Sequence, residues 1–137
     1  MGWTDWNLAL NMRGGPNWIN NYVDAPIIVN ANADEFYKQP MFYFLGHFSR
    51  FVPPGSVRID SQLSGPAYNG TAGVAANPVE SVAFDTPDGQ RVLVLLNRDV
   101  SANYTVIVRD AQQGGKSAVV EMEPNSIVTA IWAQPKH

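Results

Sequence analysis

The second part of the chain, residues 56–137, alternates short apolar stretches with clusters of turn-forming residues. Val82 and Phe84 would share one face of an extended strand, and residues 91–97 (RVLVLLN) form a nearly continuous apolar run. A run of this length with β-branched residues is typical of a central strand buried on both faces rather than of a helix. The sequence therefore predicts about six strands, in nearly sequential antiparallel order: 56–60, 79–85, 91–97, 104–109, 117–122 and 126–133.

Turn chemistry separates these strands. Thr86-Pro87-Asp88-Gly89 favours a hairpin, because Pro presets φ and Asp-Gly tolerates a positive φ. A polar, Gly-containing turn spans 110–116, and Pro124-Asn125 joins the last two strands. Residues 61–77 are small and polar without a period, so we expect a loop there.

One amphipathic helix is predicted in the first part of the chain. Pro40 is suited to a first helical position, and Pro53-Pro54-Gly55 ends the run. The apolar residues recur at helical spacing and form a wide aromatic stripe: Met41, Phe44, Leu45, Phe48 and Val52. Such a stripe needs a large apolar partner.

Three strands are expected upstream of this helix. Residues 2–10 (GWTDWNLAL) are almost wholly apolar, and 26–30 and 35–38 flank a polar turn. A single strand–loop–helix unit cannot build a parallel sheet alone, so the first part resembles a piece of a larger fold. We therefore divide the chain into residues 1–55 and a β-domain of residues 56–137.

Composition narrows the function classes. The chain has 137 residues, 45% of them hydrophobic, and a net charge of −3 with scattered basic residues, which argues against a nucleic-acid surface. Without cysteines, and with His47 and His137 as its only histidines, it has no recognisable metal-ligand spacing. We expect no metal, no cofactor, no phosphate loop, no transmembrane segment and no visible signal peptide; the compartment stays open.

Four segments resemble the C-terminal region of glucosylceramidases in glycoside hydrolase family 30: GWTDWNLALN (2–11), GGPNW (14–18), NNYVDAPIIV (20–29) and FYKQPMFYFLGHFSRFVPPGS (36–56). The resemblance continues more loosely through VLVLLNR (92–98) and SIVTAIW (126–132). It implies a mainly β fold: an antiparallel β-sandwich preceded by a remnant of a TIM barrel. Residues 2–10 would match the last barrel strand and 40–51 the last barrel helix.

The resemblance also implies a chemistry, retaining hydrolysis of a β-glucosidic bond in glucosylceramide or related β-glucosides by two glutamates. Family members are often secreted or lysosomal. Both catalytic glutamates belong to barrel strands that would lie upstream of residue 1. None of the glutamates present matches their motifs: Glu35, Glu80, Glu121 and Glu123. We therefore expect no activity from the chain alone, and we expect its main partner to be the remainder of the barrel enzyme.

The resemblance points to four substrate-binding residues. Trp6 follows the pattern of a tryptophan at the end of the last barrel strand, and Asn21 that of an asparagine bordering the glucose pocket. Tyr22 and Asp24 lie in the same loop, where Asp24 is equally suited to capping a turn. Taken without the resemblance, Trp6 reads as a core residue and Asn21 as a turn residue.

Other conspicuous residues are interpreted as structural. Asp5 is expected to accept a structural hydrogen bond, and Trp3, Trp18 and His47 to pack. Two tripeptides fit the N-glycosylation pattern by chance, at Asn69 and Asn103.

Two other functions stay open. A free-standing carbohydrate-binding or structural β-module is disfavoured because its aromatics are isolated: Tyr68, Tyr104 and Trp132. A relation to β-1,6-glucanases or xylanases of the same family would change only the substrate. If the barrel residues lack a barrel, their apolar side chains need another cover, such as the β-domain or a second copy of the chain.

Overall fold

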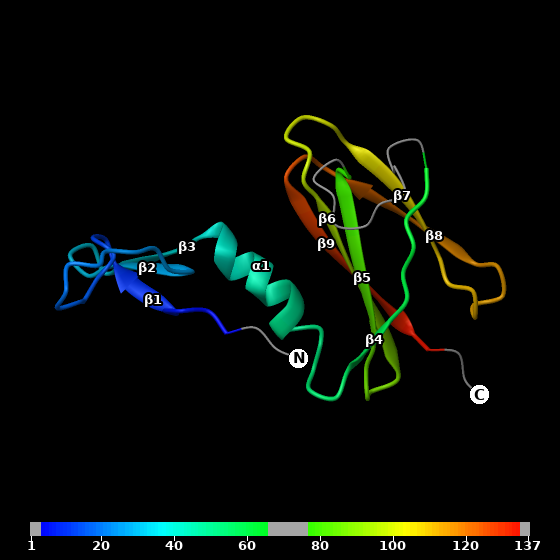
Figure 1. Ribbon diagram of the computed structural model, residues 1–137, viewed down its shortest axis with the longest axis horizontal. Helices are drawn as coiled ribbons and strands as arrows, with labels where there is room; N and C mark the ends of the chain where they lie inside the picture. The colour runs from blue at the N-terminus through cyan, green and yellow to red at the C-terminus, as the bar shows by residue number, and fades with distance from the viewer. Residues whose placement is uncertain (1–3, 66–76, 135–137) are drawn as a thin grey trace. The chain divides into compact units, whose positions relative to one another are not determined.

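The computed structural model describes residues 4–65 and 77–134, which form two compact units, Met1–Gly46 and His47–His137 (Figure 1). Trp3, Tyr68 and the sequon at Asn69 lie outside the described residues. Among the described residues, no helix is long and apolar enough to cross a membrane.

The first unit contains a three-stranded sheet in the order β1 (Ala9–Asn11), β2 (Ile27–Asn30) and β3 (Glu35–Lys38). The β2–β3 hairpin lies where the sequence predicts it, and Ile28 pairs with Tyr37 across it. Strand β1 runs parallel to β2, with Leu10 opposite Ile28. Leu10 is buried, with 6% of its surface exposed.

The prediction for the first strand was wrong in two respects. Residues 2–10 were expected to form a strand, yet within the described part of this segment, from residue 4 onward, strand structure begins only at Ala9. The reason is that β2 is the one described neighbour and its ladder covers only 9–11. The single parallel strand was expected to find no sheet. It joins the β2–β3 hairpin instead, since the long loop between β1 and β2 returns the chain in the same direction.

Helix α1 (Pro40–Ser49) begins at the predicted proline. The Phe42 amide donates to the Gln39 carbonyl at 2.9 Å, and the Val52 amide donates to Phe48 at 2.9 Å just before the two prolines. The helix ends earlier than the apolar spacing suggested. Phe44 and Phe48 of the predicted stripe remain 38% and 42% exposed.

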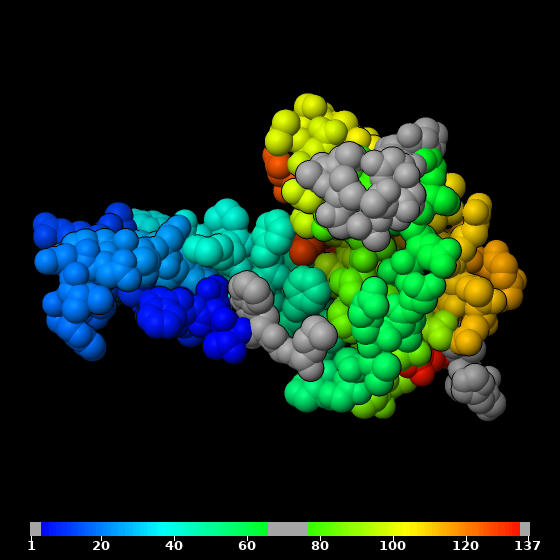
Figure 2. Space-filling view, viewed as in Figure 1, coloured from blue at the N-terminus to red at the C-terminus, as the bar shows by residue number. Residues whose placement is uncertain are grey.

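The second unit contains the six predicted strands: β4 (Val57–Ile59), β5 (Val79–Asp85), β6 (Gln90–Asn97), β7 (Tyr104–Arg109), β8 (Ser117–Met122) and β9 (Ser126–Ala133). One sheet has the order β4-β5-β6-β9 and the other is the β7-β8 hairpin, yellow to orange in Figures 1 and 2. All pairings are antiparallel. The order is not fully sequential, because β9 pairs with β6 and the β7–β8 hairpin forms the second layer.

The core of this unit lies between the two sheets. Leu93 and Leu95 of β6 pack with Met122 of β8, and partly buried residues of β7 and β9 surround them. On the opposite face of β6, Val92 and Val94 are also buried, at 1% and 3% exposure. Strand β6 is therefore buried on both faces, as its apolar run predicts.

Polar residues close both ends of the inward face of β6. At one end, the Asn97 amide donates to the carbonyls of Ala102 at 2.9 Å and Glu123 at 2.8 Å. At the other end lies Arg91, which is 9% exposed. Leu93 and Leu95 thus lie between Asn97 at one end of this face and Arg91 at the other. The buried side-chain nitrogens of both polar residues donate hydrogen bonds within the protein.

Candidate functional site

The four predicted substrate-binding residues belong to the first unit, before β1 and in the loop from β1 to β2. Trp6 precedes β1 and is 84% exposed, and its amide donates to Asp5 Oδ1 at 2.9 Å. That contact gives Asp5 a local structural role. The Trp6 indole N–H has no hydrogen-bond partner among the described residues.

The loop is shaped at its start by Asn11. Its Oδ1 accepts from the amides of Arg13 at 2.9 Å and Gly15 at 3.0 Å. The chain then folds back so that Gly14 meets Val23. A Cβ on Gly14 would lie 2.3 Å from the Val23 carbonyl oxygen, and the φ of Gly14 is +76°. Only glycine fits this approach.

Asn21 is held by its backbone and keeps its side chain free. Its amide donates to Asn17 Oδ1 at 3.1 Å, and the preceding Asn20 has a φ of 58°. The Asn21 side chain is exposed and forms no hydrogen bond with the described residues. Asn17 is the residue that sequence reasoning missed, and its Nδ2 is buried without a partner in the described part of the chain. The Asn before Trp in GGPNW was the available signal.

The Asp24 carboxylate accepts hydrogen bonds within the protein. Its Oδ1 accepts from the Ala25 amide at 2.8 Å and from the Gln39 side chain, whose Nε2 also donates to the Ala25 carbonyl at 3.1 Å. This pattern matches the turn-cap alternative and ties the loop to the residue before α1. Tyr22 is 59% exposed. No hydrogen bond among the described residues joins Trp6, Asn21, Tyr22 and Asp24 to one another.

Three of the four glutamates have local partners. Glu35 accepts from the Tyr37 hydroxyl at 2.7 Å, Glu80 pairs with Arg98 at 2.8 Å, and Glu121 accepts from Thr105 at 2.8 Å. Within residues 4–65 and 77–134, no group of three or more His, Cys, Asp and Glu side chains could hold a metal ion.

His47 makes a long-range contact within the second unit. Its Nδ1 lies 2.7 Å from Thr129 Oγ1 of β9, and burial lowers the pKa of its imidazole. A neutral imidazole in contact with a hydroxyl fits the structural role expected for it.

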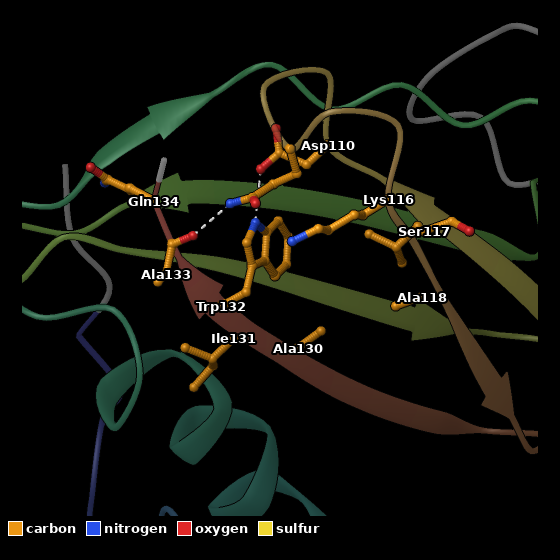
Figure 3. A pocket seen from close by; sticks show the side chains of 11 residues that line it. Asp110, Lys116, Ser117, Ala118, Ala130, Ile131, Trp132, Ala133 and Gln134 are labelled. Atoms are coloured by element: carbon orange, nitrogen blue, oxygen red, sulfur yellow. Dashed lines mark hydrogen bonds between the residues drawn. The ribbon is translucent and has the colours of Figure 1, made fainter. Parts of the chain in front are cut away.

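A polar cluster in the second unit, which we call the Arg91 cluster, links the four-stranded sheet to the turn after β7. Arg91 Nε donates to Asp85 at 2.9 Å, Nη1 to Asp110 Oδ1 at 2.6 Å, and Nη2 to Gln112 Oε1 at 2.6 Å. The Trp132 indole N–H donates to Asp110 Oδ2 at 2.8 Å (Figure 3).

The cluster changes two pKa values. Burial acts to raise the pKa of Asp110, but hydrogen bonds from Trp132, Gln112 and Arg91 outweigh it and lower that pKa below 3.8. Hydrogen bonds to Asp85 and Asp110 raise the pKa of Arg91. Asp110 and Arg91 are therefore both charged at neutral pH. Sequence reasoning missed it, because Arg91 reads as the polar start of an apolar strand.

Both parts of the chain match models of known protein families. The model of the glycosyl hydrolase family 30 TIM-barrel domain matches residues 1–52, and that of the family 30 beta sandwich domain matches residues 55–130. The boundary predicted after residue 55 itself stays a prediction.

Individual relatives agree with this match. The chain is 47% identical over 132 residues to the lysosomal acid glucosylceramidase of Mus musculus, covering 96% of this chain and 23% of that protein. The crystal structure of SrfJ from Salmonella typhimurium superposes with a TM-score of 0.78 at 37% identity, covering 96% of this chain and 26% of that one. The endo-β1,6-glucanase BT3312 superposes with a TM-score of 0.73 at 27% identity, covering 95% and 26%. The chain thus spans about a quarter of the length of these relatives.

Proposed function

The chain belongs to glycoside hydrolase family 30, and on that basis we propose that it forms one wall of the glucose pocket of a retaining β-glucosidase of the glucosylceramidase type. The proposal rests on one observation in particular. The Trp6 indole and the side-chain carboxamide of Asn21 lie in the segments of specific resemblance, and both are exposed with no hydrogen bond to the described residues. They are free to bind a ligand.

Each residue then has a distinct role. Trp6 presents an apolar ring to the C–H face of the sugar and an N–H to a hydroxyl. Asn21 offers both an acceptor and a donor to sugar hydroxyls. Tyr22 borders the entrance. Asp24, through Gln39, positions the loop that carries Asn21, and it reaches substrate only if that pairing opens.

The bond-breaking groups come from outside this chain. Retaining hydrolysis needs two carboxyl groups about 5 Å apart, one as nucleophile and one as acid and base. Glu35, Glu80 and Glu121 are each bound to a local partner, which supports the proposal that the chain alone is inactive. The remainder of the barrel is its partner, and glucosylceramide or another β-glucoside is the substrate of the intact enzyme.

A chimera tests the role of Trp6. In the mouse glucosylceramidase, the matching 132 residues would be replaced by those of this chain. We expect Trp6→Ala to lower kcat/KM on a 4-nitrophenyl β-glucoside about 30-fold, the loss of one aromatic contact and one hydrogen bond. Trp18→Ala is the matched control, since Trp18 is assigned no substrate contact and, contrary to the packing expected from the sequence, is 95% exposed in the same unit. Equal losses in both variants would refute the assignment of Trp6.

The isolated chain provides the complementary test. It should release no 4-nitrophenol above background, and turnover that copurifies with it would overturn the claim that catalysis needs the rest of the barrel. The β-1,6-glucanase alternative is decided in the chimera by comparing hydrolysis of glucosylceramide with that of a β-1,6-glucan.

We also propose self-association, which the exposed apolar residues of the first unit support. Trp18, Ile19 and Phe36 are 95%, 71% and 60% exposed. Large exposed apolar groups favour association when nothing covers them. In the absence of the barrel remainder, a second copy of the chain would supply that cover.

A further inference from the structure

The loop from β1 to β2 carries Asn21, and backbone contacts hold its base. The Asn11 amide donates to the Gly15 carbonyl at 2.6 Å, and the Gly14 amide donates to the Asn11 carbonyl at 2.9 Å. The Val23 amide donates to the Gly14 carbonyl at 3.4 Å, where two segments of the loop approach each other. These contacts fix the base of the loop, but none of them involves Asn21 itself.

One side chain reaches Asn21 from within the loop. Asn17 Oδ1 accepts from the Asn21 amide at 3.1 Å, a bond that spans four positions of the chain. Directly before Asn21, Asn20 has a φ of 58°, in the left-handed region that asparagine adopts more readily than most residues. The bond and the turn together set the direction in which the Asn21 side chain leaves the backbone. Because both partners belong to one loop, no other segment is needed to form this bond.

The Asn17 side chain is itself held in place. Its Nδ2 is buried, whereas the neighbouring Trp18 is 95% exposed. A side chain that is packed in this way offers its acceptor oxygen at a fixed position. Asn21, in contrast, has an exposed side chain that forms no hydrogen bond with the described residues. A fixed acceptor behind a free carboxamide is the arrangement expected of a residue that supports a binding residue.

From these contacts we infer that Asn17 is a positioning residue for the glucose pocket and acts on the sugar only through Asn21. The inference rests on the proposed function, because it takes Asn21 as a residue that contacts glucose. The Asn17 acceptor restricts the loop to the conformation in which Asn21 meets a sugar hydroxyl. A binding group that already has its bound conformation loses less entropy when the ligand arrives. Without that acceptor, only a fraction of the molecules would present Asn21 correctly, and the apparent affinity would fall by that fraction.

A purely structural role for Asn17 makes a different prediction. If the side chain only stabilised the fold, its loss would reduce the amount of folded enzyme, and kcat per total enzyme would fall at an unchanged KM. A positioning role raises KM instead, because saturating substrate draws the loop back into the binding conformation and leaves kcat close to its original value.

Asn17→Ala in the chimera with the mouse glucosylceramidase tests the inference on the 4-nitrophenyl β-glucoside. KM should rise about fivefold, the value of one hydrogen bond, with kcat within about twofold of the unmodified chimera. In an Asn21→Ala background, the same change should leave KM where Asn21→Ala alone puts it. Asn30→Ala is the matched control and should leave KM unchanged. It removes an asparagine of the same unit, outside the loop, whose Nδ2 donates to the Tyr37 hydroxyl at 3.2 Å.

A measurement on the full chain alone tests the hydrogen bond without relying on activity. The exchange of the Asn21 backbone amide with water, followed by NMR, should be about fivefold faster in Asn17→Ala than in wild type. An unchanged rate would mean that the Asn17 acceptor does not hold the Asn21 amide, and the inference would be wrong.

The kinetic outcomes separate the inference from the proposed function. Suppose that Asn21→Ala raises KM, but that Asn17→Ala raises it by the same factor with and without Asn21, or lowers kcat at an unchanged KM. The glucose contact of Asn21 then stands, and the positioning role of Asn17 is refuted. If Asn21→Ala leaves KM unchanged, the assignment of Asn21 to the glucose pocket fails, and the positioning role fails with it.

Discussion

Among single residues, Arg91 is a largely buried cation that pairs with two carboxylates. Its guanidinium lies at the end of the inward face of β6 with 11% of its side chain exposed, and Asp85 and Asp110 both pair with it. The three charges come from β5, β6 and the turn after β7. Removing one partner from a buried pair leaves an uncompensated charge, which costs more than the pair itself contributes. Asp110 should therefore matter more to stability than an exposed carboxylate.

We predict that Asp110→Asn lowers the free energy of unfolding by about 2 kcal/mol at pH 7, while the amide oxygen still accepts from Trp132. The folded pKa of Asp110 lies below its ordinary value of 3.8, so its contribution is present above that value and is lost as the pH falls through the folded pKa. In urea unfolding curves, the difference between wild type and variant should stay constant from pH 7 down to about pH 4 and should shrink below that pH.

The matched control is Glu80→Gln, which removes an exposed pair with Arg98. Both side chains are more than one third exposed, so solvent screening leaves a contribution of about 0.5 kcal/mol or less. An Asp110→Asn effect no larger than this control would contradict the role of the Arg91 cluster.

Residue-level prediction from the sequence depended on motif context. Trp6 and Asn21 could be named because GWTDWNLALN and NNYVDAPIIV are specific segments, but their role in binding is still a prediction. The contact between Asp110 and Trp132 could not be derived. It joins residues 22 positions apart, one in the turn after β7 and one in β9, and no local pattern encodes which strands pack face to face.

At the level of elements, the sequence predicts a strand, turn or helix correctly where the residues of that segment themselves determine its structure. The apolar run of β6, the Pro-Asp-Gly turn and Pro40 all lie where the sequence predicts them. Strand β1 is shorter than expected because its length depends on a neighbour. The position of β9 beside β6 likewise depends on which edge stays open after β5 and β6 have paired, and that choice is not local.

The loop between β1 and β2 depends on Gly14. We predict that Gly14→Ala destabilises the first unit by about 3 kcal/mol, because the added Cβ would meet the Val23 carbonyl at a positive φ. Gly46→Ala is the control: nothing lies within 4 Å of its Cβ position, and alanine favours the helix by about 0.5–1 kcal/mol.

Proteolysis of the two glycine variants measures both effects. Cleavage within residues 12–26 should become faster in Gly14→Ala and slower or unchanged in Gly46→Ala. If Gly14→Ala is as resistant as wild type, the close approach to Val23 does not define the loop.

For the molecule as a whole, apolar burial is concentrated in one unit. The hydrophobic cluster around Leu95 and Met122 lies in the second unit, whereas the buried apolar residues of the first unit in the described chain include Leu10 and Ala25. Backbone amides of β2 should therefore exchange with solvent at least about 100-fold faster than those of β6, measured by native-state hydrogen exchange. Equal protection of β2 and β6 would mean that the units unfold together.

We also predict that the sedimentation coefficient of the chain rises with concentration. Trp18→Ser combined with Ile19→Ser should reduce this rise, since both residues are largely exposed and their loss removes apolar surface. Val100→Ser, which changes a residue 77% exposed in the second unit, is the control. A clean monomer at all concentrations would exclude self-association.

The pairing of β9 with β6 has a consequence for biosynthesis. Along residues 90–97 every position of the central strand is matched to one in 126–133, so the ribosome completes the partner of β6 last. Until then the run from Val92 to Leu95 has one open edge, and such an edge can recruit a neighbouring nascent chain. A premature stop codon before Ser126 would make that exposure permanent, and the expected product is an aggregate cleared by proteases rather than a shorter soluble domain.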